Sequence, residues 1–250
     1  MTPFWIALQF LTTLPTPRIN TYGDKEMGQS VLFYPLAGLI IGLILGVFSL
    51  LLAQYSIDNI YGELLNAGLL LALWVALTGA LHIDGLADCA DAWMGGLGDK
   101  EKTLSILKDP TSGPIALTVV ILLLLLKWLC LSILLSATSS AYFLLIPALS
   151  RCGLLLFFLT LPYVREKGIA ATMAKTLPRQ SAFVIIALTS SMMILFYPAG
   201  ILSFIALGLL FWLFHQSLLQ RLQGFTGDTL GAWVECSELI LLLCAVFSLR

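Results

Sequence analysis

The chain has 250 residues, of which 59% are hydrophobic and only 11% are charged, with a formal net charge of −1 at pH 7. A soluble domain carries about 25% charged residues, so this composition excludes an ordinary soluble protein and predicts an integral membrane protein. The near-neutral charge provides no general attraction to nucleic acid, which is not an expected partner.

Seven apolar segments are long enough to cross a bilayer, which takes about 20 mostly apolar residues. They cover 31–53, 64–82, 114–135, 139–161, 181–197, 199–216 and 231–249. The shorter apolar segment 4–14 is expected to lie at the interface or to re-enter the membrane, and it does not read as a cleaved signal peptide. The predicted fold is an all-α, polytopic membrane bundle with about seven transmembrane helices, in which 1–250 form a single membrane-embedded domain.

Basic residues alternate between the loops that separate these spans. From the segment before the first span onward, the loops carry 2, 0, 3, 0, 4, 0 and 1 lysines and arginines, and the C-terminal Arg250 is the one exception. The positive-inside rule therefore places the N-terminus and all the basic loops in the cytosol. Since no large soluble domain is predicted, any chemistry is expected at the cytosolic membrane boundary.

The first span contains Gly38, Gly42 and Gly46, one glycine at every fourth position. Small residues at this spacing let another helix approach closely. The partner helix could belong to the same bundle, or it could belong to a second copy in a homo-oligomer.

Three aspartates follow the second span within the stretch HIDGLADCADAW (82–93). Asp84, Asp88 and Asp91 have the spacing i, i+4 and i+7, which places them on one face of a helix. Three carboxylates on one face repel one another unless a cation lies between them, and hard oxygen ligands suit Mg²⁺ or Ca²⁺. The simpler alternative is that Asp84 caps the helix and the others form a solvated face.

A second acidic stripe precedes the last span, in GFTGDTLGAWVECSE (224–238). Asp228, Glu235 and Glu238 share one helix face, and the two glutamates lie within an apolar segment. An ionisable residue there is a functional hypothesis by default. The alternative is that 231–238 lies in the interface and the span is shorter. Both clusters are expected on the cytosolic side, where they could converge on one metal-bound anionic substrate.

Two basic residues are predicted inside spans. Lys127 should have a partner or extend to the interface, and Arg151 could be an internal counter-ion or an anion-binding group.

The five cysteines form no CxxC pair and the two histidines are far apart, so we expect no zinc site. A cytosolic carboxylate site that binds Mg²⁺ would suit phosphoryl chemistry.

Several blocks resemble the signature sequences of the cobalamin synthase family, the adenosylcobinamide-GDP ribazoletransferases. They are FLTTLPTP (10–17), FYPLAGLIIG (33–42), HIDGLADCADAW (82–93), ILKDPTSG (106–113), PYVREKG (162–168) and TGDTLGAWVECSE (226–238). The resemblance implies a Mg²⁺-dependent enzyme of a bacterial inner membrane with its active site facing the cytosol. A ribose hydroxyl of α-ribazole, or of its 5′-phosphate, would attack the phosphate on the aminopropanol arm of adenosylcobinamide-GDP. GMP would leave, and adenosylcobalamin or its 5′-phosphate would form.

The resemblance also implies roles for particular residues. The expected metal ligands are Asp84, Asp88, Asp91, Asp228 and Glu235. Catalysis is expected to involve His82, Asp84, Lys108 and Asp109, with His82 or a carboxylate as the base; His82 could alternatively be a plain interface residue. The expected substrate-binding residues are Gly85, Gly113, Arg151, Thr226, Gly227 and Glu238.

This chain departs from the family pattern at two expected phosphate-binding arginines. Thr13 stands at one of these positions, and Asp109-Pro110-Thr111 replaces the usual Asp-Ser-Arg. The departures shift the expected phosphate contacts to Lys108 or Arg18.

Two alternative functions remain open. One is a lipid enzyme like the CDP-alcohol phosphotransferases, but the DGxxAR and GxxxDxxxD pattern of that family is incomplete here. The other, which is not an enzyme, is a cation transporter, and a transporter would normally place acidic residues near mid-membrane on repeated helices.

Overall fold

The computed structural model describes residues 1–19, 21–55, 59–136, 141–165, 168–197 and 200–249. Over these residues the chain is helical and has no β-strand; an isolated bridge pairs Tyr163 with Phe225. A bilayer favours this outcome, because helices satisfy every backbone N–H and C=O within the segment. The predicted all-α class is confirmed.

Within the described ranges, seven helical segments are long and apolar enough to cross a membrane, the number predicted. The first combines α2 (Asp24–Ser30), the 3-10 helix η1 (Val31–Phe33) and α3 (Tyr34–Gln54). The others are α4 (Ile60–Thr78), α7 (Pro114–Ser136), α8 (Ala141–Thr160), α10 (Arg179–Phe196), α11 (Gly200–Arg221) and α12 (Gly227–Phe247).

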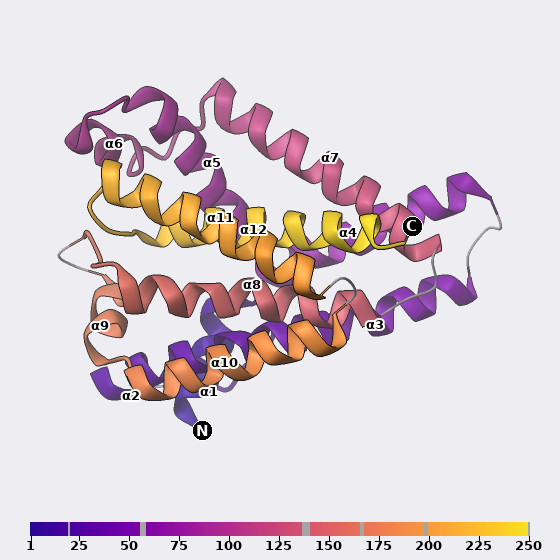
Figure 1. Cartoon of the computed structure of the whole chain (residues 1–250), viewed down its shortest axis with the longest axis horizontal. Helices are drawn as coiled ribbons and strands as arrows, with labels where there is room; N and C mark the ends of the chain where they lie inside the picture. Colours follow the sequence, from indigo (N-terminus) through magenta and orange to yellow (C-terminus); the bar gives the residue numbers. More distant parts are fainter. Residues whose placement is uncertain (20, 56–58, 137–140, 166–167, 198–199, 250) are drawn as a thin grey trace.

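Four shorter helices complete the described chain: α1 (Thr2–Leu11), α5 (Leu81–Gly95), α6 (Lys100–Ile106) and α9 (Ile169–Thr176). α1 has ten residues and is therefore about 15 Å long, half of what a bilayer core requires. α5, α6 and α9 gather at one end of the bundle, at the left of Figure 1.

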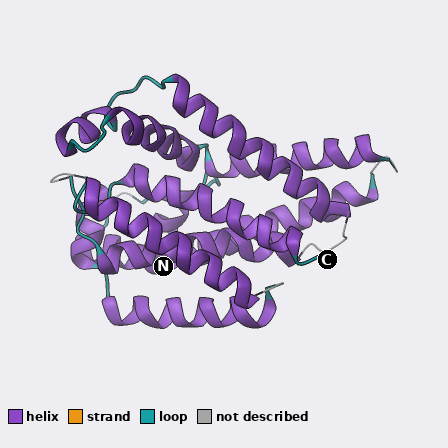
Figure 2. Ribbon diagram, turned by 45° about the horizontal axis from the view of Figure 1, so that its top comes forward, coloured by secondary structure: helices purple, strands orange, loops and turns teal. Residues whose placement is uncertain are grey.

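The long helices run roughly side by side (Figure 2), and α8 and α12 lie near the centre of the bundle (Figure 1). Most of the apolar window of α8 (78%) and of α12 (67%) is buried, whereas only 11% of the α10 and α11 windows is buried. α10 and α11 therefore present most of their surface outward, where lipid would cover it. α3 packs along α8, and α12 packs along both α5 and α8.

The chain breaks between α4 and α5 at two consecutive residues with left-handed backbones, Gly79 (φ 60°) and Ala80 (φ 58°). Their N–H groups donate to the carbonyls of Ala76 and Val75 and close the end of α4. The second span therefore ends at Thr78, earlier than the predicted residue 82. HIDGLADCADAW consequently belongs to a separate helix.

Two of the three glycines in the first span, Gly38 and Gly42, pack within the chain. A Cβ atom added to Gly38 or Gly42 would overlap the backbone of α8, at Pro147 and Leu144 respectively. These two glycines therefore allow α3 and α8 to approach closely, which is the first of the two interpretations considered from the sequence.

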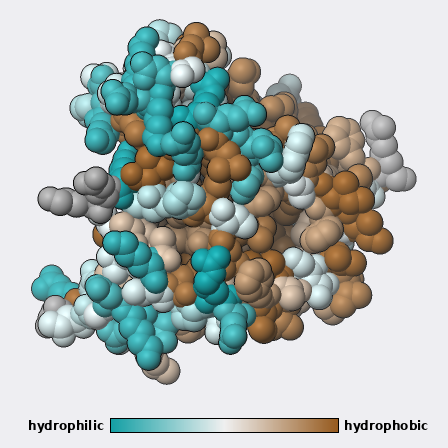
Figure 3. Space-filling view, turned by 60° about the vertical axis from the view of Figure 1, so that its left-hand side comes forward, coloured by the Kyte–Doolittle hydropathy of each residue, from teal (hydrophilic) through white to brown (hydrophobic). Residues whose placement is uncertain are grey.

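The basic loops meet at one end of the bundle. Lys100 Nζ donates to Gln223 Oε1 at 3.0 Å, and Arg221 Nη1 donates to the Trp93 carbonyl at 2.6 Å. These contacts join the α5–α6 region to the turn before α12. Figure 3 shows hydrophilic side chains gathered over this end and apolar ones along the flank, the pattern expected of a membrane boundary.

Candidate active site

The two acidic blocks meet where α5 crosses α12. A Cβ atom added to Gly85 would lie 2.7 Å from the backbone oxygen of Asp228, and one added to Gly231 would lie 3.1 Å from that of His82. Only glycine lets the two backbones approach this closely. The crossing brings Asp84, on α5, to the same cavity as Asp228 in the first turn of α12.

Asp88 lies in the field of the other aspartates. Its pKa is raised to about 6, first by burial and then by the negative charges of Asp84 and Asp228, while Arg165 acts in the opposite direction. Within the described part of the chain, neither Asp84 nor Asp88 forms an ion pair. Carboxylates crowded in this way fit the hard oxygen donors that Mg²⁺ prefers.

No three of the described carboxylate, imidazole and thiol groups converge into a ready-made metal cage. Asp91 lies seven residues beyond Asp84, a rise of about 10 Å along the helix. Its carboxylate accepts hydrogen bonds from the N–H groups of Gly113 at 2.5 Å and Ala116 at 3.0 Å, where α7 begins. Asp91 therefore caps α7, a role that the sequence did not indicate.

A small cavity of about 130 Å³ lies beside the aspartates, between α1, α3, α5, α8, α9 and α12. His82, Asp84 and Gly85 line it from α5, and Gly227 and Asp228 line it from α12. Most of the remaining wall is apolar. Five predicted site residues from two distant sequence blocks thus share one cavity, in which charged groups face a largely apolar enclosure.

A second group of ionisable side chains is buried deeper, among α7, α8 and α12. Lys127 Nζ lies 2.6 Å from Glu235 Oε2 and 2.7 Å from Glu238 Oε2, and Arg151 Nη1 pairs with Glu238 Oε1. All four side chains are at most 5% exposed. Two cations therefore balance two carboxylates in a low-dielectric interior, which is how buried charges are tolerated.

This network gives two of the predicted site residues, Glu235 and Glu238, ion-pair partners that the sequence did not indicate. Glu235 lies seven residues from Asp228, about 10 Å further along α12, and it pairs with Lys127 rather than joining the aspartates. Glu238 is 1% exposed and has a cation on each oxygen, so in the structure it is an internal ion-pair partner. Lys127 has the partner expected of an intramembrane lysine, and Arg151 is an internal counter-ion, the first of its two interpretations.

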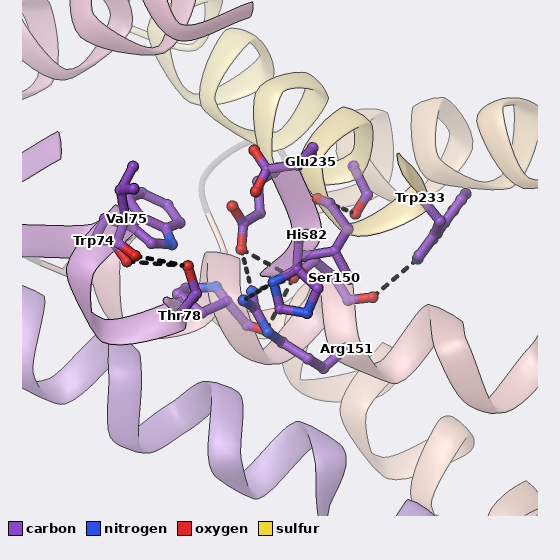
Figure 4. Close-up of polar contacts among 12 residues, drawn as sticks. Trp74, Val75, Thr78, His82, Ser150, Arg151, Trp233 and Glu235 are labelled. Atoms are coloured by element: carbon purple, nitrogen blue, oxygen red, sulfur yellow. Dashed lines mark hydrogen bonds and ion pairs between the residues drawn. The ribbon is translucent and has the colours of Figure 1, made fainter. Parts of the chain in front are cut away.

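His82 connects the buried network to the cavity (Figure 4). Its Nδ1 lies 3.5 Å from Arg151 Nη2, and its buried Nε2 has no hydrogen-bond partner among the described residues. Burial first, and then the charge of Arg151, lower the pKa of His82 to about 3. The imidazole is therefore neutral, and at 3% exposure it is not a plain interface residue.

The family model for cobalamin-5-phosphate synthase matches residues 3–246. The chain belongs to this family. Its relatives include proteins from Stutzerimonas stutzeri, 46% identical over 98% of this chain and 96% of the relative, and from Pseudomonas entomophila, 46% identical over 97% and 98%. A third, from Pseudomonas fluorescens, is 43% identical over 97% and 98%. All three are named adenosylcobinamide-GDP ribazoletransferase. No solved structure gives a significant match.

The full-length match to the cobalamin-5-phosphate synthase family favours the predicted enzyme over the lipid-enzyme and transporter alternatives.

The other predicted site residues lie around the same end of the bundle. Lys108 and Asp109 are exposed between α6 and α7, and hydrogen bonds from Thr111 to the Asp109 carboxylate lower its pKa. Thr226 is the N-cap of α12: its hydroxyl accepts from the Thr229 N–H at 3.3 Å.

Sequence reasoning assigned Arg165 only to membrane topology. In the structure its Nη2 lies 2.5 Å from Asp228 Oδ2 and donates to the Leu107 carbonyl at 3.2 Å. Arg165 is thus a cation that directly contacts the aspartate site. Its position in PYVREKG, one of the blocks that carry the family resemblance, was the available signal.

Proposed function

We propose that this chain is a Mg²⁺-dependent adenosylcobinamide-GDP ribazoletransferase that acts at the cytosolic face of a bacterial inner membrane. A ribose hydroxyl of α-ribazole, or of its 5′-phosphate, forms a new bond to the phosphorus on the aminopropanol arm of adenosylcobinamide-GDP. The bond between the two phosphates breaks, GMP leaves, and the hydroxyl proton is released. The product is adenosylcobalamin or its 5′-phosphate, so the reaction closes the nucleotide loop.

The full-length match to one family of ribazoletransferases carries this proposal. The aspartate site is compatible with it. Mg²⁺ is commonly held by one or two carboxylates together with substrate phosphates and waters, so three converging ligands are not required. Asp84, Asp88 and Asp228 are the carboxylates that would hold the ion, which would neutralise charge on the diphosphate.

The remaining side chains orient the reactants. Gly85 keeps α5 and α12 close enough for Asp84 and Asp228 to face one cavity. Arg165, paired with Asp228, supplies positive charge where phosphate oxygens would lie. A loose phosphoryl-transfer transition state asks little of a base. His82 is a poor proton acceptor because its pKa is lowered to about 3, so a neighbouring carboxylate is the better candidate.

The cytosolic orientation rests on the distribution of basic residues. The loops that carry them share the end of the bundle with α5, α6 and α9, and the positive-inside rule assigns such loops to the cytosol. A cysteine-accessibility experiment with an impermeant thiol reagent tests this assignment. Cysteine introduced at the exposed Lys102 should be labelled in inverted membrane vesicles and not in intact spheroplasts.

The activity is tested by incubating the purified protein in liposomes with adenosylcobinamide-GDP, α-ribazole and Mg²⁺. GMP and the corrinoid product should form in equal amounts, and EDTA should abolish both. Asp84→Asn should lose turnover while inserting normally, whereas the matched control Glu101→Gln, on the exposed face of α6, should keep it. Full turnover by Asp84→Asn would refute the proposed metal site, and no product from folded wild-type protein would refute the activity.

A further inference from the structure

A larger cavity, of about 500 Å³, lies on the other side of Arg165. It is formed by the end of α8, the segment 161–165, α9 and the start of α10. Cavities of about 300–1,000 Å³ are typical of sites for small molecules. None of the predicted catalytic, metal-binding or substrate-binding residues lines this cavity.

Three basic side chains from three different segments line this cavity: Arg165, Lys175 and Arg179. Among the lining residues that the structure describes, none is acidic. Within the described part of the chain, Lys175 and Arg179 form no ion pair. Lys175 and Arg179 therefore face the hollow without an acidic partner, and cations placed in this way repel one another and favour an anion between them.

Arg179 and Arg165 are held in place by main-chain contacts. Arg179 Nη2 donates to the Leu159 carbonyl at 2.6 Å, and Arg165 Nη2 donates to that of Leu107 at 3.2 Å. The Nε atom of Arg165 is buried without a hydrogen-bond partner among the described residues. An N–H donor of this kind, beside a basic cavity, suits a phosphate oxygen, for which arginine geometry is favourable.

This basic cavity adjoins the aspartate site. Arg165 lines the cavity and pairs with Asp228, which lines the smaller cavity together with Asp84. Phe158 forms part of the wall of both. An anion held by Lys175 and Arg179 would therefore lie one side chain away from the carboxylates proposed to hold the metal.

We infer that this basic cavity binds the phosphate of a nucleotide, with Lys175 and Arg179 as its main contacts and Arg165 between it and the metal site. The inference rests on the proposed function, in which both substrates are nucleotide-like. Two sources share this chemistry: the guanylate part of adenosylcobinamide-GDP, which leaves as GMP, and the 5′-phosphate of α-ribazole 5′-phosphate. Tyr163 adds an aromatic ring to the wall, beside the basic groups.

The test compares wild-type protein with Lys175→Ala and Arg179→Gln. Lys102→Ala, which removes an exposed lysine from α6 at the same end, is the matched control. Binding of GMP, α-ribazole 5′-phosphate, α-ribazole and inorganic phosphate is measured by calorimetry, and KM is measured for each substrate. Loss of one charged contact to a phosphate should weaken binding about tenfold, and Lys175→Arg should restore most of it.

The two sources give different patterns. If guanylate occupies the cavity, the Kd of GMP and the KM of adenosylcobinamide-GDP rise together, while α-ribazole 5′-phosphate is unaffected. If the lower-ligand phosphate occupies it, only the constants for α-ribazole 5′-phosphate rise, toward those of unphosphorylated α-ribazole. Either pattern supports the nucleotide site.

Wild-type constants in both variants, for every nucleotide, would overturn the inference. Weakened binding of inorganic phosphate alone would also overturn it, because the site would then hold only a free anion. The proposed function fails separately: a wild-type protein that binds GMP through Lys175 but forms no product would keep the cavity and refute the reaction. Lys175→Ala keeps the test decisive if Arg179→Gln fails to fold, because the Lys175 side chain is exposed.

Discussion

Replacing Lys127 by methionine tests whether the buried charges stabilise the bundle as a balanced set. Lys127 Nζ contacts two carboxylates at 2.6 and 2.7 Å, and all three side chains are buried. Among the described side chains, Lys127→Met leaves Glu235 and Glu238 with Arg151 as their only cation, a net charge of −1. Removing one partner of a buried pair costs about 3–5 kcal/mol, and we expect the free energy of unfolding to fall by this amount.

A second substitution separates charge from packing. In Lys127→Met/Glu235→Gln the pair of Arg151 with Glu238 remains and the network is neutral again, so more than half of the lost stability should return. Unfolding by sodium dodecyl sulfate in mixed micelles, followed by tryptophan fluorescence, measures these differences. The exposed control Lys102→Met should change the free energy by less than about 0.5 kcal/mol. A single variant as stable as wild type, or a double variant no better than the single, would refute the reasoning.

Three further substitutions test the geometry of the site. Glu235→Gln should leave the Mg²⁺ concentration for half-maximal GMP release unchanged, because Glu235 lies about 10 Å along α12 from Asp228 and Lys127 keeps its pair with Glu238, which still holds α12 to α7; a raised requirement would return Glu235 to the metal site. Gly85→Ala would place a Cβ atom 2.7 Å from the Asp228 carbonyl oxygen, so α5 and α12 must move apart. Because a misplacement of reacting groups by about 1 Å can lower the rate about 100-fold, turnover should fall at least about tenfold. Gly208→Ala, in open space on α11, is its control and should be fully active; equal rates for the two variants would contradict the close-packing argument. Asp91→Ala should lower the free energy of unfolding by about 1 kcal/mol through loss of the α7 cap, with an unchanged Mg²⁺ requirement; a changed requirement would make Asp91 a ligand.

The spans could be predicted because a bilayer selects for length and apolar character alone. The start of α5 could not be placed from the same signal, because the apolar run continues through Gly79 and Ala80 while the backbone there is left-handed and ends α4. Gly79 was the local indication of a helix end. Its left-handed partner is an alanine, a residue that seldom adopts this conformation and gives no such indication.

The acidic residues show what helical spacing can and cannot predict. Periodicity correctly placed Asp84, Asp88 and Asp91 on one helix, but seven residues of helix are about 10 Å long. Residues that share a face therefore lie at different depths. Asp91 reaches α7 and Glu235 reaches Lys127, contacts that depend on how α7 packs against its neighbours and that spacing along one helix does not contain. Arg165 was missed for the same reason, since it meets Asp228 only after the chain has folded.

One helix connects the buried charges to the proposed metal site. α12 carries Asp228 in its first turn and Glu235 and Glu238 two to three turns deeper. Lys127 ties the deeper part to α7 and Arg151 ties it to α8, so rotating α12 about its axis would break ion pairs in a low-dielectric interior. The rotation of α12 sets the direction in which Asp228 faces. The buried network therefore acts as a positioning device: charges held inside the membrane orient a carboxylate at its boundary, where a site must be held to within about 0.5 Å.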